Sequence, residues 1–236
     1  MKNKFDVIVM DPPWGEFKDS LKMSSVKRGA SANYQTMTLE DIKSLPIAEA
    51  AASDGAILAL WCPSSLLKDG LEVMSAYGFE FKQTFVWVKI KKHRFQSFTK
   101  WLYKSVLKQK QVCYDKFAYK RAINAVIDNV SNIDMNDELA FGMGHLGRNT
   151  HELVLIGTCG NIYSKIKNRS QRTVFFYENT KHSKKPELLQ DKLELMFPNL
   201  NYLEVFGRRS RSNWVVIGNE APDTLGQDVR VSLSNL

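Results

Sequence analysis

The residues that most strongly suggest chemistry are Asp11-Pro12-Pro13-Trp14, which directly follow the apolar run Phe5–Met10. The run predicts a buried strand, and ligands of open α/β sheets bind where such strands reach their carboxyl ends. The paired prolines hold a rigid, extended turn. This turn leaves the carbonyl oxygen of Pro12 without a ladder partner and free to face a ligand, beside the carboxylate of Asp11.

These acceptors and the neighbouring aromatic ring predict the kind of ligand. Two acceptors side by side match the two N–H donors of an amino group, and Trp14 adds a flat face on which a base can stack. Together they predict a pocket for an exocyclic amine on a planar heterocycle. The alternative is a plain turn, because Asp-Pro commonly ends a strand.

Seven short apolar runs predict the strands that must position this motif. Their continuous hydrophobicity is typical of strands buried on both faces, as in a parallel sheet covered by helices. The runs are residues 5–10, 56–61, 85–88, 153–156, 174–176, 202–206 and 214–217. Helix signals fall between these runs, so the pattern predicts a doubly wound α/β fold with helices on both faces.

Two of the helix signals are specific enough to give boundaries. Thr38 is typical of an N-cap and predicts a helix that continues into the alanine-rich residues 48–52. Pro186 suits the first turn of a helix over residues 187–196.

Positive charge is concentrated in one stretch of the chain. The 236 residues include 33 Lys and Arg and 25 Asp and Glu, a formal net charge of +8 at pH 7 that suits a polyanionic partner. Residues 89–121 hold eleven of the basic residues and one acid, with aromatic residues between them. We expect residues 91–140 to form a basic helical insertion, with Lys100, Lys104 and Lys108 facing nucleic-acid phosphates as a candidate target-recognition element. A solvated helical hairpin packed on the core is the alternative.

Other residue types exclude several classes of protein. The three cysteines are far apart, so no disulfide framework is predicted and a reducing cytoplasm is indicated. The four histidines have no metal-ligand spacing to these cysteines, so no metal site is expected. The apolar runs are too short to span a bilayer, and the first of them stops at Asp11, so neither a membrane protein nor a signal peptide is predicted.

The motifs of this chain resemble those of the MT-A70 family, the adenine-N6 methyltransferases of RNA and DNA. The resemblance begins with the tetrapeptide at Asp11 and continues in family order to Glu220. Its further motifs are Tyr34-Gln35-Thr36-Met37, Leu60-Trp61, Trp87-Val88-Lys89, Gly144-His145, Arg148-Asn149, His151-Glu152, Lys185-Pro186-Glu187, Phe206-Gly207-Arg208 and Asn213-Trp214 through Gly218-Asn219-Glu220.

The resemblance implies a fold, a cofactor and a domain layout. The fold is a Rossmann-like class I methyltransferase sheet of about seven strands, in a permuted order that places the catalytic motif ahead of the cofactor strand. The implied methyl donor is S-adenosylmethionine. We therefore expect a methyltransferase domain in residues 1–90 and 141–220, the insertion in 91–140, and a loose C-terminal tail in 221–236.

The resemblance also assigns roles to residues at matching positions. Asp11 and Pro12 would accept the hydrogens of the adenine amino group, within a catalytic motif that includes Pro13 and Trp14. The implied substrate contacts are Tyr34, Lys89, His145, Arg148 and Asn149. The implied cofactor contacts are Asp11, Lys185, Glu204, Phe206, Gly207, Arg208, Asn219 and Glu220.

The nature of the substrate is the least determined part of this interpretation. The compact chain is similar to bacterial or phage members of the family, which favours DNA over RNA and a bacterial or phage-infected cytosol. Methylation of RNA is the nearest alternative. A non-catalytic nucleic-acid-binding subunit is a second, although such paralogues lose the acidic tetrapeptide that is intact here. A homodimer is compatible with the resemblance.

Overall fold

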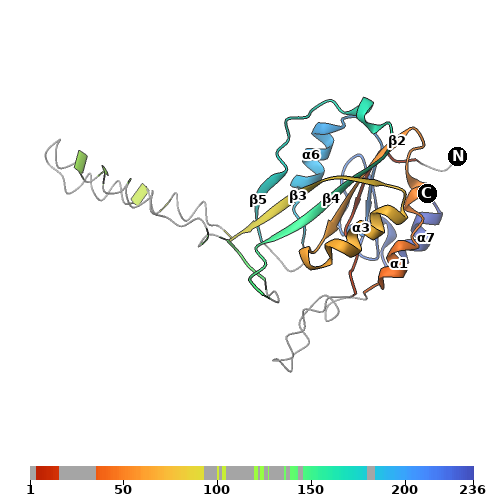
Figure 1. Cartoon of the computed structure of the whole chain (residues 1–236), viewed down its shortest axis with the longest axis horizontal. Coiled ribbons are helices and arrows are strands. Elements are labelled where there is room, and N and C mark those ends of the chain that lie inside the picture. Colours follow the sequence, from red (N-terminus) through yellow and green to blue (C-terminus); the bar gives the residue numbers. More distant parts are fainter. Residues whose placement is uncertain are drawn as a thin grey trace, which may run out of the picture.

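The computed structural model describes residues 4–15, 36–92, 139–142, 146–179 and 184–236, together with scattered positions between 100 and 136. Within these residues, seven strands form one sheet in the order β5-β3-β4-β2-β1-β6-β7 (Figure 1). The strands are β1 (Val7–Met10), β2 (Gly55–Cys62), β3 (Glu80–Ile90), β4 (His151–Gly160), β5 (Val174–Glu178), β6 (Tyr202–Val205) and β7 (Trp214–Ile217). The sheet confirms the predicted α/β class.

One strand of the described sheet runs against the others. β1 is parallel to β2 and β6, β6 is parallel to β7, and β3 is parallel to β5, whereas β4 is antiparallel to both β2 and β3. The prediction of a parallel sheet is therefore wrong for β4. Its apolar residues Val154–Ile156 are buried because a central strand is covered on both faces, and this holds for either strand direction.

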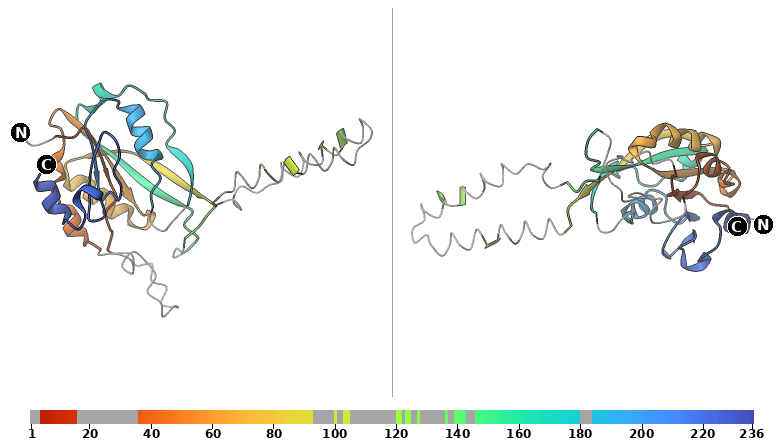
Figure 2. Two further views of the ribbon diagram at one scale, coloured as in Figure 1. Left: turned by 180° about the vertical axis from the view of Figure 1, so that it is seen from behind. Right: turned by 90° about the horizontal axis from the view of Figure 1, so that it is seen from below.

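Helices cover both faces of the sheet, as predicted. One face packs against α1 (Leu39–Lys43), α2 (Ile47–Ala50), α3 (Leu67–Ala76) and α7 (Val229–Ser234), and the other against α6 (Leu188–Met196). Figure 2 shows α3 and α6 on opposite sides of the strands. Short 3-10 turns connect the elements at η2 (Ser64–Leu66), η4 (Ile162–Lys165) and η5 (Pro222–Thr224). In this part of the chain no helix is both long enough and apolar enough to cross a bilayer.

The two predicted helix starts are close to the observed ones. The hydroxyl of Thr38 accepts a hydrogen bond from the backbone N–H of Asp41 at 3.1 Å, which confirms the N-cap. The helix nevertheless ends at Lys43, and Pro46 then precedes the separate helix α2, because proline cannot continue the helical hydrogen bonds. α6 begins after Pro186, as expected.

The prediction of a loose tail after residue 220 is wrong. Residues Val229–Ser234 form α7, whose N-cap Asp228 accepts a hydrogen bond from the backbone N–H of Arg230. Val229 and Leu233 are buried in the same core as α1 and α3. The polar composition of this segment describes the outer face of α7, while these two apolar residues, four positions apart, attach its inner face.

Candidate active site

A cavity of about 830 Å³ opens at the edge of the sheet where β1, β2, β3, β6 and β7 reach their carboxyl ends. Because β4 runs in the opposite direction, its amino end lies at this same edge. The cavity lining includes Asp11, Pro12, Pro13, Trp14, Trp61, Trp87, Lys89, Asn149, Glu152, Lys185, Phe206, Gly207, Arg208, Asn219 and Glu220. The structure therefore brings most of the described candidate residues to one place.

The turn that follows β1 is held by main-chain hydrogen bonds. The N–H of Met37 donates to the carbonyl of Pro13, and the N–H of Gly15 donates to the carbonyl of Met37, both at 2.9 Å. The carbonyl of Pro12 accepts from the N–H of Trp14 at 2.9 Å, which is a bond within the turn and not a ladder bond, so this carbonyl is less free to face a ligand than predicted. A carbonyl oxygen has two lone pairs, so this tight turn leaves Pro12 one further acceptor site.

Three tryptophans give the cavity an aromatic lining. Trp14 is only 5% exposed, and its Nε1 donates to the backbone carbonyl of Trp61 at 3.1 Å. The rings of Trp61 and Trp87 meet edge to face with their centroids 6.0 Å apart. The indole of Trp14 is thus fixed and almost wholly buried, so it offers a stacking base little of the flat face that the sequence predicts.

A chain of alternating charges crosses the cavity. The Nζ of Lys185 lies 2.8 Å from each carboxylate oxygen of Asp11 and 3.3 Å from Oε2 of Glu152. The other oxygen of Glu152 lies 2.6 Å from Nζ of Lys89. No more than 25% of any of these four side chains is exposed. Because they are shielded from water, these ion pairs are stronger than pairs on the surface.

Burial and the neighbouring charges set the protonation of this network. Loss of hydration raises the pKa of Asp11 above its ordinary value; Lys185 and Arg208 oppose the rise and Glu152 adds to it. Burial alone would raise the pKa of Glu152, but Lys185 and Lys89 hold it below its ordinary value. Burial alone would lower the pKa of Lys185, but Asp11 and Glu152 raise it. Lys185 is therefore a constant positive charge, and Asp11 is the acid of the network whose pKa is raised.

One wall of the cavity is built from the loops that follow β6 and β7. A Cβ on Gly207 would lie 2.2 Å from Cγ1 of Val216, and a Cβ on Gly218 would lie 2.8 Å from the carbonyl oxygen of Gly207. Both positions therefore require glycine. Phe206 has a φ of 66°, so the chain turns sharply where it leaves β6. These features let two stretches of backbone approach each other closely beside the cavity.

The predicted cofactor residues divide into two groups in the structure. Lys185, Phe206, Gly207, Arg208, Asn219 and Glu220 line the cavity together with Asp11. Glu204 is not among the lining residues. A Cβ on Gly207 would lie 3.3 Å from Cγ of Glu204, which places this side chain beside the loop, and burial raises the pKa of its carboxyl group.

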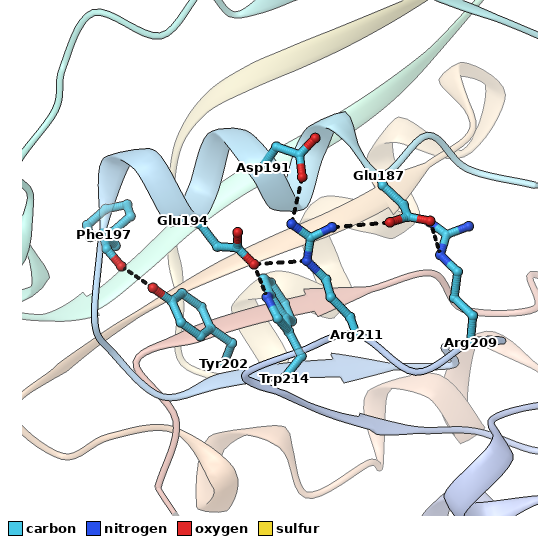
Figure 3. Close-up of polar contacts among 8 residues, drawn as sticks. All are labelled: Glu187, Asp191, Glu194, Phe197, Tyr202, Arg209, Arg211 and Trp214. Atoms are coloured by element: carbon cyan, nitrogen blue, oxygen red, sulfur yellow. Dashed lines mark hydrogen bonds and ion pairs between the residues drawn. The ribbon is translucent and has the colours of Figure 1, made fainter.

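Two arginines of the β6–β7 loop fasten that loop to α6 (Figure 3). Arg211 contacts three carboxylates of this region, those of Glu187 at 3.3 Å, Asp191 at 2.6 Å and Glu194 at 2.9 Å. Arg209 contacts the same Glu187 at 2.6 Å. Glu187 is two residues beyond Lys185, so these contacts also fix the segment that carries the lysine of the cavity.

Removal of the Arg211 guanidinium is expected to destabilise the protein. The Arg211 side chain is 15% exposed, and Arg211→Met leaves three carboxylates of the α6 region without this partner, so the free energy of unfolding should fall by about 2 kcal/mol. Asp191→Asn removes one exposed partner and should cost about 0.5 kcal/mol. Urea denaturation of both variants measures the difference. Equal losses would contradict a multidentate role for Arg211.

The predicted substrate residues are only partly placed by the structure. Lys89 and Asn149 line the cavity, and Arg148 lies beside the ring of Phe141. Lys100 and Lys104 are exposed. Tyr34, His145, Lys108 and most of the predicted insertion 91–140 lie outside the described residues.

Glu152 is the central residue that the candidate set omitted. It bridges Lys89 and Lys185, and it belongs to the strand that runs against the others. A charged residue at the start of an apolar run is a visible signal in the sequence. Whether this residue reaches the cavity depends on the direction of β4, because a parallel β4 would have placed Glu152 at the far edge of the sheet.

This chain is similar to known proteins over most of its length. The model of the MT-A70 family matches residues 5–102 and 98–220. The Type II methyltransferase M.MunI of Mycoplasma sp is 23% identical over 236 aligned residues, which cover 94% of this chain and 80% of the relative.

Two eukaryotic relatives match a shorter part. The N6-adenosine-methyltransferase non-catalytic subunit MTB of Arabidopsis thaliana is 36% identical over 90 residues, or 38% of this chain and 11% of the relative. The N(6)-adenosine-methyltransferase non-catalytic subunit METTL14 of Xenopus laevis is 34% identical over 94 residues, or 39% of this chain and 19% of the relative.

Proposed function

This chain belongs to the MT-A70 family and is a methyltransferase, and we propose that it transfers a methyl group from S-adenosylmethionine to the N6 amino group of adenine in DNA. The observation that carries the proposal is the carboxylate of Asp11, held by Lys185 inside a cavity with aromatic walls. We place the reaction in the cytoplasm.

The acceptor groups at Asp11 and Pro12 suit the chemistry of an aromatic amine. Adenine N6 is a poor nucleophile, because its lone pair is delocalised into the ring. Hydrogen bonds from N6–H to the carboxylate of Asp11 and the carbonyl of Pro12 favour a pyramidal nitrogen and increase its electron density. The transfer then depends on positioning and electrostatics more than on a strong base. Asp11 need not remove the proton before attack, since solvent can take it afterwards.

The wall formed by the β6 and β7 loops suits the methyl donor. S-adenosylmethionine supplies a methyl group that the positive charge of its sulfonium already activates. Gly207 lets the backbone of this loop pack closely against Val216 at the side of the cavity. Asn219 and Glu220 offer acceptors for ribose hydroxyls, and Arg208 offers a cation for a carboxylate. A cavity of about 830 Å³ is in the range of sites that enclose ligands of this size.

Two observations favour DNA and a catalytic role over the alternatives. The similarity to a Type II methyltransferase extends over 94% of this chain, whereas the similarity to the two adenosine methyltransferase subunits covers less than half of it. Those two relatives are named as non-catalytic subunits. In this chain Asp11 is present and is held by a half-buried lysine, which supports a catalytic chain.

A methylation assay with three substrates tests this proposal. Tritiated S-adenosylmethionine is supplied with duplex DNA, single-stranded DNA or RNA, and the modified positions are then found by sequencing. We expect transfer to adenine in DNA. A duplex substrate must expose its adenine by base flipping to reach such a cavity, so single-stranded DNA should also serve. Transfer to RNA alone would replace the DNA proposal, and no transfer to any substrate would remove the catalytic one.

We further propose that the basic residues of the 91–140 segment bind the phosphates of the substrate. Reversing the charge at Lys100, Lys104 and Lys108 should weaken DNA binding and lower the slope of log K against log salt concentration by about three. Binding measured by fluorescence anisotropy at several salt concentrations gives the slope. The control is Lys68→Glu, which changes a lysine whose side chain is 89% exposed on α3. A slope unchanged by the triple reversal would reject this role.

A further inference from the structure

An exposed aromatic ring lies at the rim of the cavity. Phe141 lines the cavity, yet it is 58% exposed. The guanidinium carbon of Arg148 lies 5.4 Å from the centroid of this ring. Neither the acceptors at Asp11 and Pro12 nor the wall formed by the β6 and β7 loops involves Phe141. A large apolar side chain at such a position gains free energy when a ligand covers it.

The main chain fixes Phe141 relative to the charges inside the cavity. The N–H of Ala140 donates to the carbonyl of Lys89 at 2.9 Å, and Gly142 and Asn149 exchange hydrogen bonds of 2.8 and 3.1 Å. Both neighbours of Phe141 are therefore anchored. Lys89 pairs with Glu152, so the main chain next to Phe141 is bonded to a residue at one end of the charge network.

We propose that Phe141 stacks against the nucleobase next to the adenine that enters the cavity. The inference rests on the proposed function for the nature of the substrate. When one nucleotide occupies the cavity, the next one must cross the rim, and its base is the first planar group outside. Every base has a π face, so such a contact contributes affinity whatever the neighbouring base is. The positive charge of Arg148 beside the ring suits a ligand that carries phosphates.

Binding and kinetic measurements on Phe141 variants test this platform. Phe141→Ala should raise the Kd for a single-stranded oligonucleotide and its KM by about tenfold, the effect of losing one stacked base. Phe141→Trp should retain wild-type affinity because it keeps a π face, whereas Phe141→Leu, which is apolar without one, should resemble Phe141→Ala. The matched control is Phe176→Ala, which removes a phenylalanine that is 52% exposed on β5 and does not line the cavity.

The outcomes separate this inference from the proposed function. Anisotropy measures oligonucleotide binding without methyl transfer, and calorimetry with S-adenosylmethionine should give the same Kd for Phe141→Ala and the wild type. If Phe141→Ala binds the oligonucleotide more weakly but the wild type methylates no substrate, the proposed function is wrong and the stacking role of Phe141 is still supported. The stacking role is overturned if Phe141→Ala and the wild type bind the oligonucleotide with equal affinity. It is also overturned if Phe176→Ala loses as much oligonucleotide affinity as Phe141→Ala does. A Phe141→Leu variant with wild-type affinity would overturn stacking as its basis.

Discussion

Replacing Asp11 with alanine is expected to lower the rate of methyl transfer by about 10²- to 10³-fold, the usual effect of losing one preorganised polar group from a catalytic site. The carboxylate is the charged acceptor that the structure places at the end of β1 inside the cavity. Asp11→Asn keeps the shape and one acceptor oxygen, so it should retain more activity than Asp11→Ala. Single-turnover rates with tritiated S-adenosylmethionine measure both variants.

A matched control for Asp11 lies at the other end of the same strand. Asp6 directly precedes β1, and one of its oxygens lies 2.6 Å from the Nζ of Lys165. Asp6→Asn therefore disturbs a comparable lysine–carboxylate pair outside the cavity. It should lower the thermal midpoint without changing the rate per folded molecule. If Asp11→Ala methylates its substrate at a rate within a few-fold of the wild type, the proposed role of this carboxylate is wrong.

Replacing Lys185 with methionine is expected to reduce activity at neutral pH by about 10²-fold and to change its pH dependence. Burial raises the pKa of Asp11, and the ammonium of Lys185 opposes that rise. Without this ammonium the pKa of Asp11 rises further. The reaction needs the ionised carboxylate, so activity is lost as pH falls through the pKa of Asp11. The acidic limb of the kcat/KM profile should therefore move to higher pH in Lys185→Met.

The shift of the acidic limb distinguishes this electrostatic role from simple destabilisation. Lys165→Met removes a lysine that pairs with Asp6 and Asp54 and does not line the cavity. It should lower stability but leave the acidic limb in place. Profiles are measured on protein shown to be folded across the pH range by circular dichroism. An acidic limb that stays at the wild-type pH in Lys185→Met would contradict the coupling between Lys185 and Asp11.

Local sequence signals were sufficient for the seven strands and for the carboxylate acceptor at Asp11. The apolar run before Asp11 predicts a buried strand, and the carboxyl end of that strand is where the structure has its cavity. The N-cap at Thr38 is equally local, because its hydroxyl bonds to a residue three positions away. Features of this kind depend on neighbouring residues and can be derived from the sequence.

Features that depend on long-range packing could not be derived in this way. The ion pair between Asp11 and Lys185 joins residues 174 positions apart. The position of Glu152 at the cavity depends on the direction of β4, which an apolar run does not encode. The hydrogen bond that occupies the carbonyl of Pro12 depends on how tightly the turn closes at Trp14. In each case the contact is determined by how the folded chain packs together, and the residue types alone do not reveal it.

The direction of β4 also bears on how the segment between β3 and β4 can vary. The chain leaves the sheet at the end of β3 and returns to it at the start of β4, at the same edge. There the N–H of Lys89 donates to the carbonyl of Thr150 at 2.8 Å. The entropy of closing a loop rises only slowly with its length, so a segment inserted between these adjacent points can be shortened, extended or replaced while the strand register stays the same. Any replacement begins and ends at the mouth of the cavity. Evolution, or an engineer, can therefore exchange the segment inserted at this junction and leave the strands that carry the cavity in place.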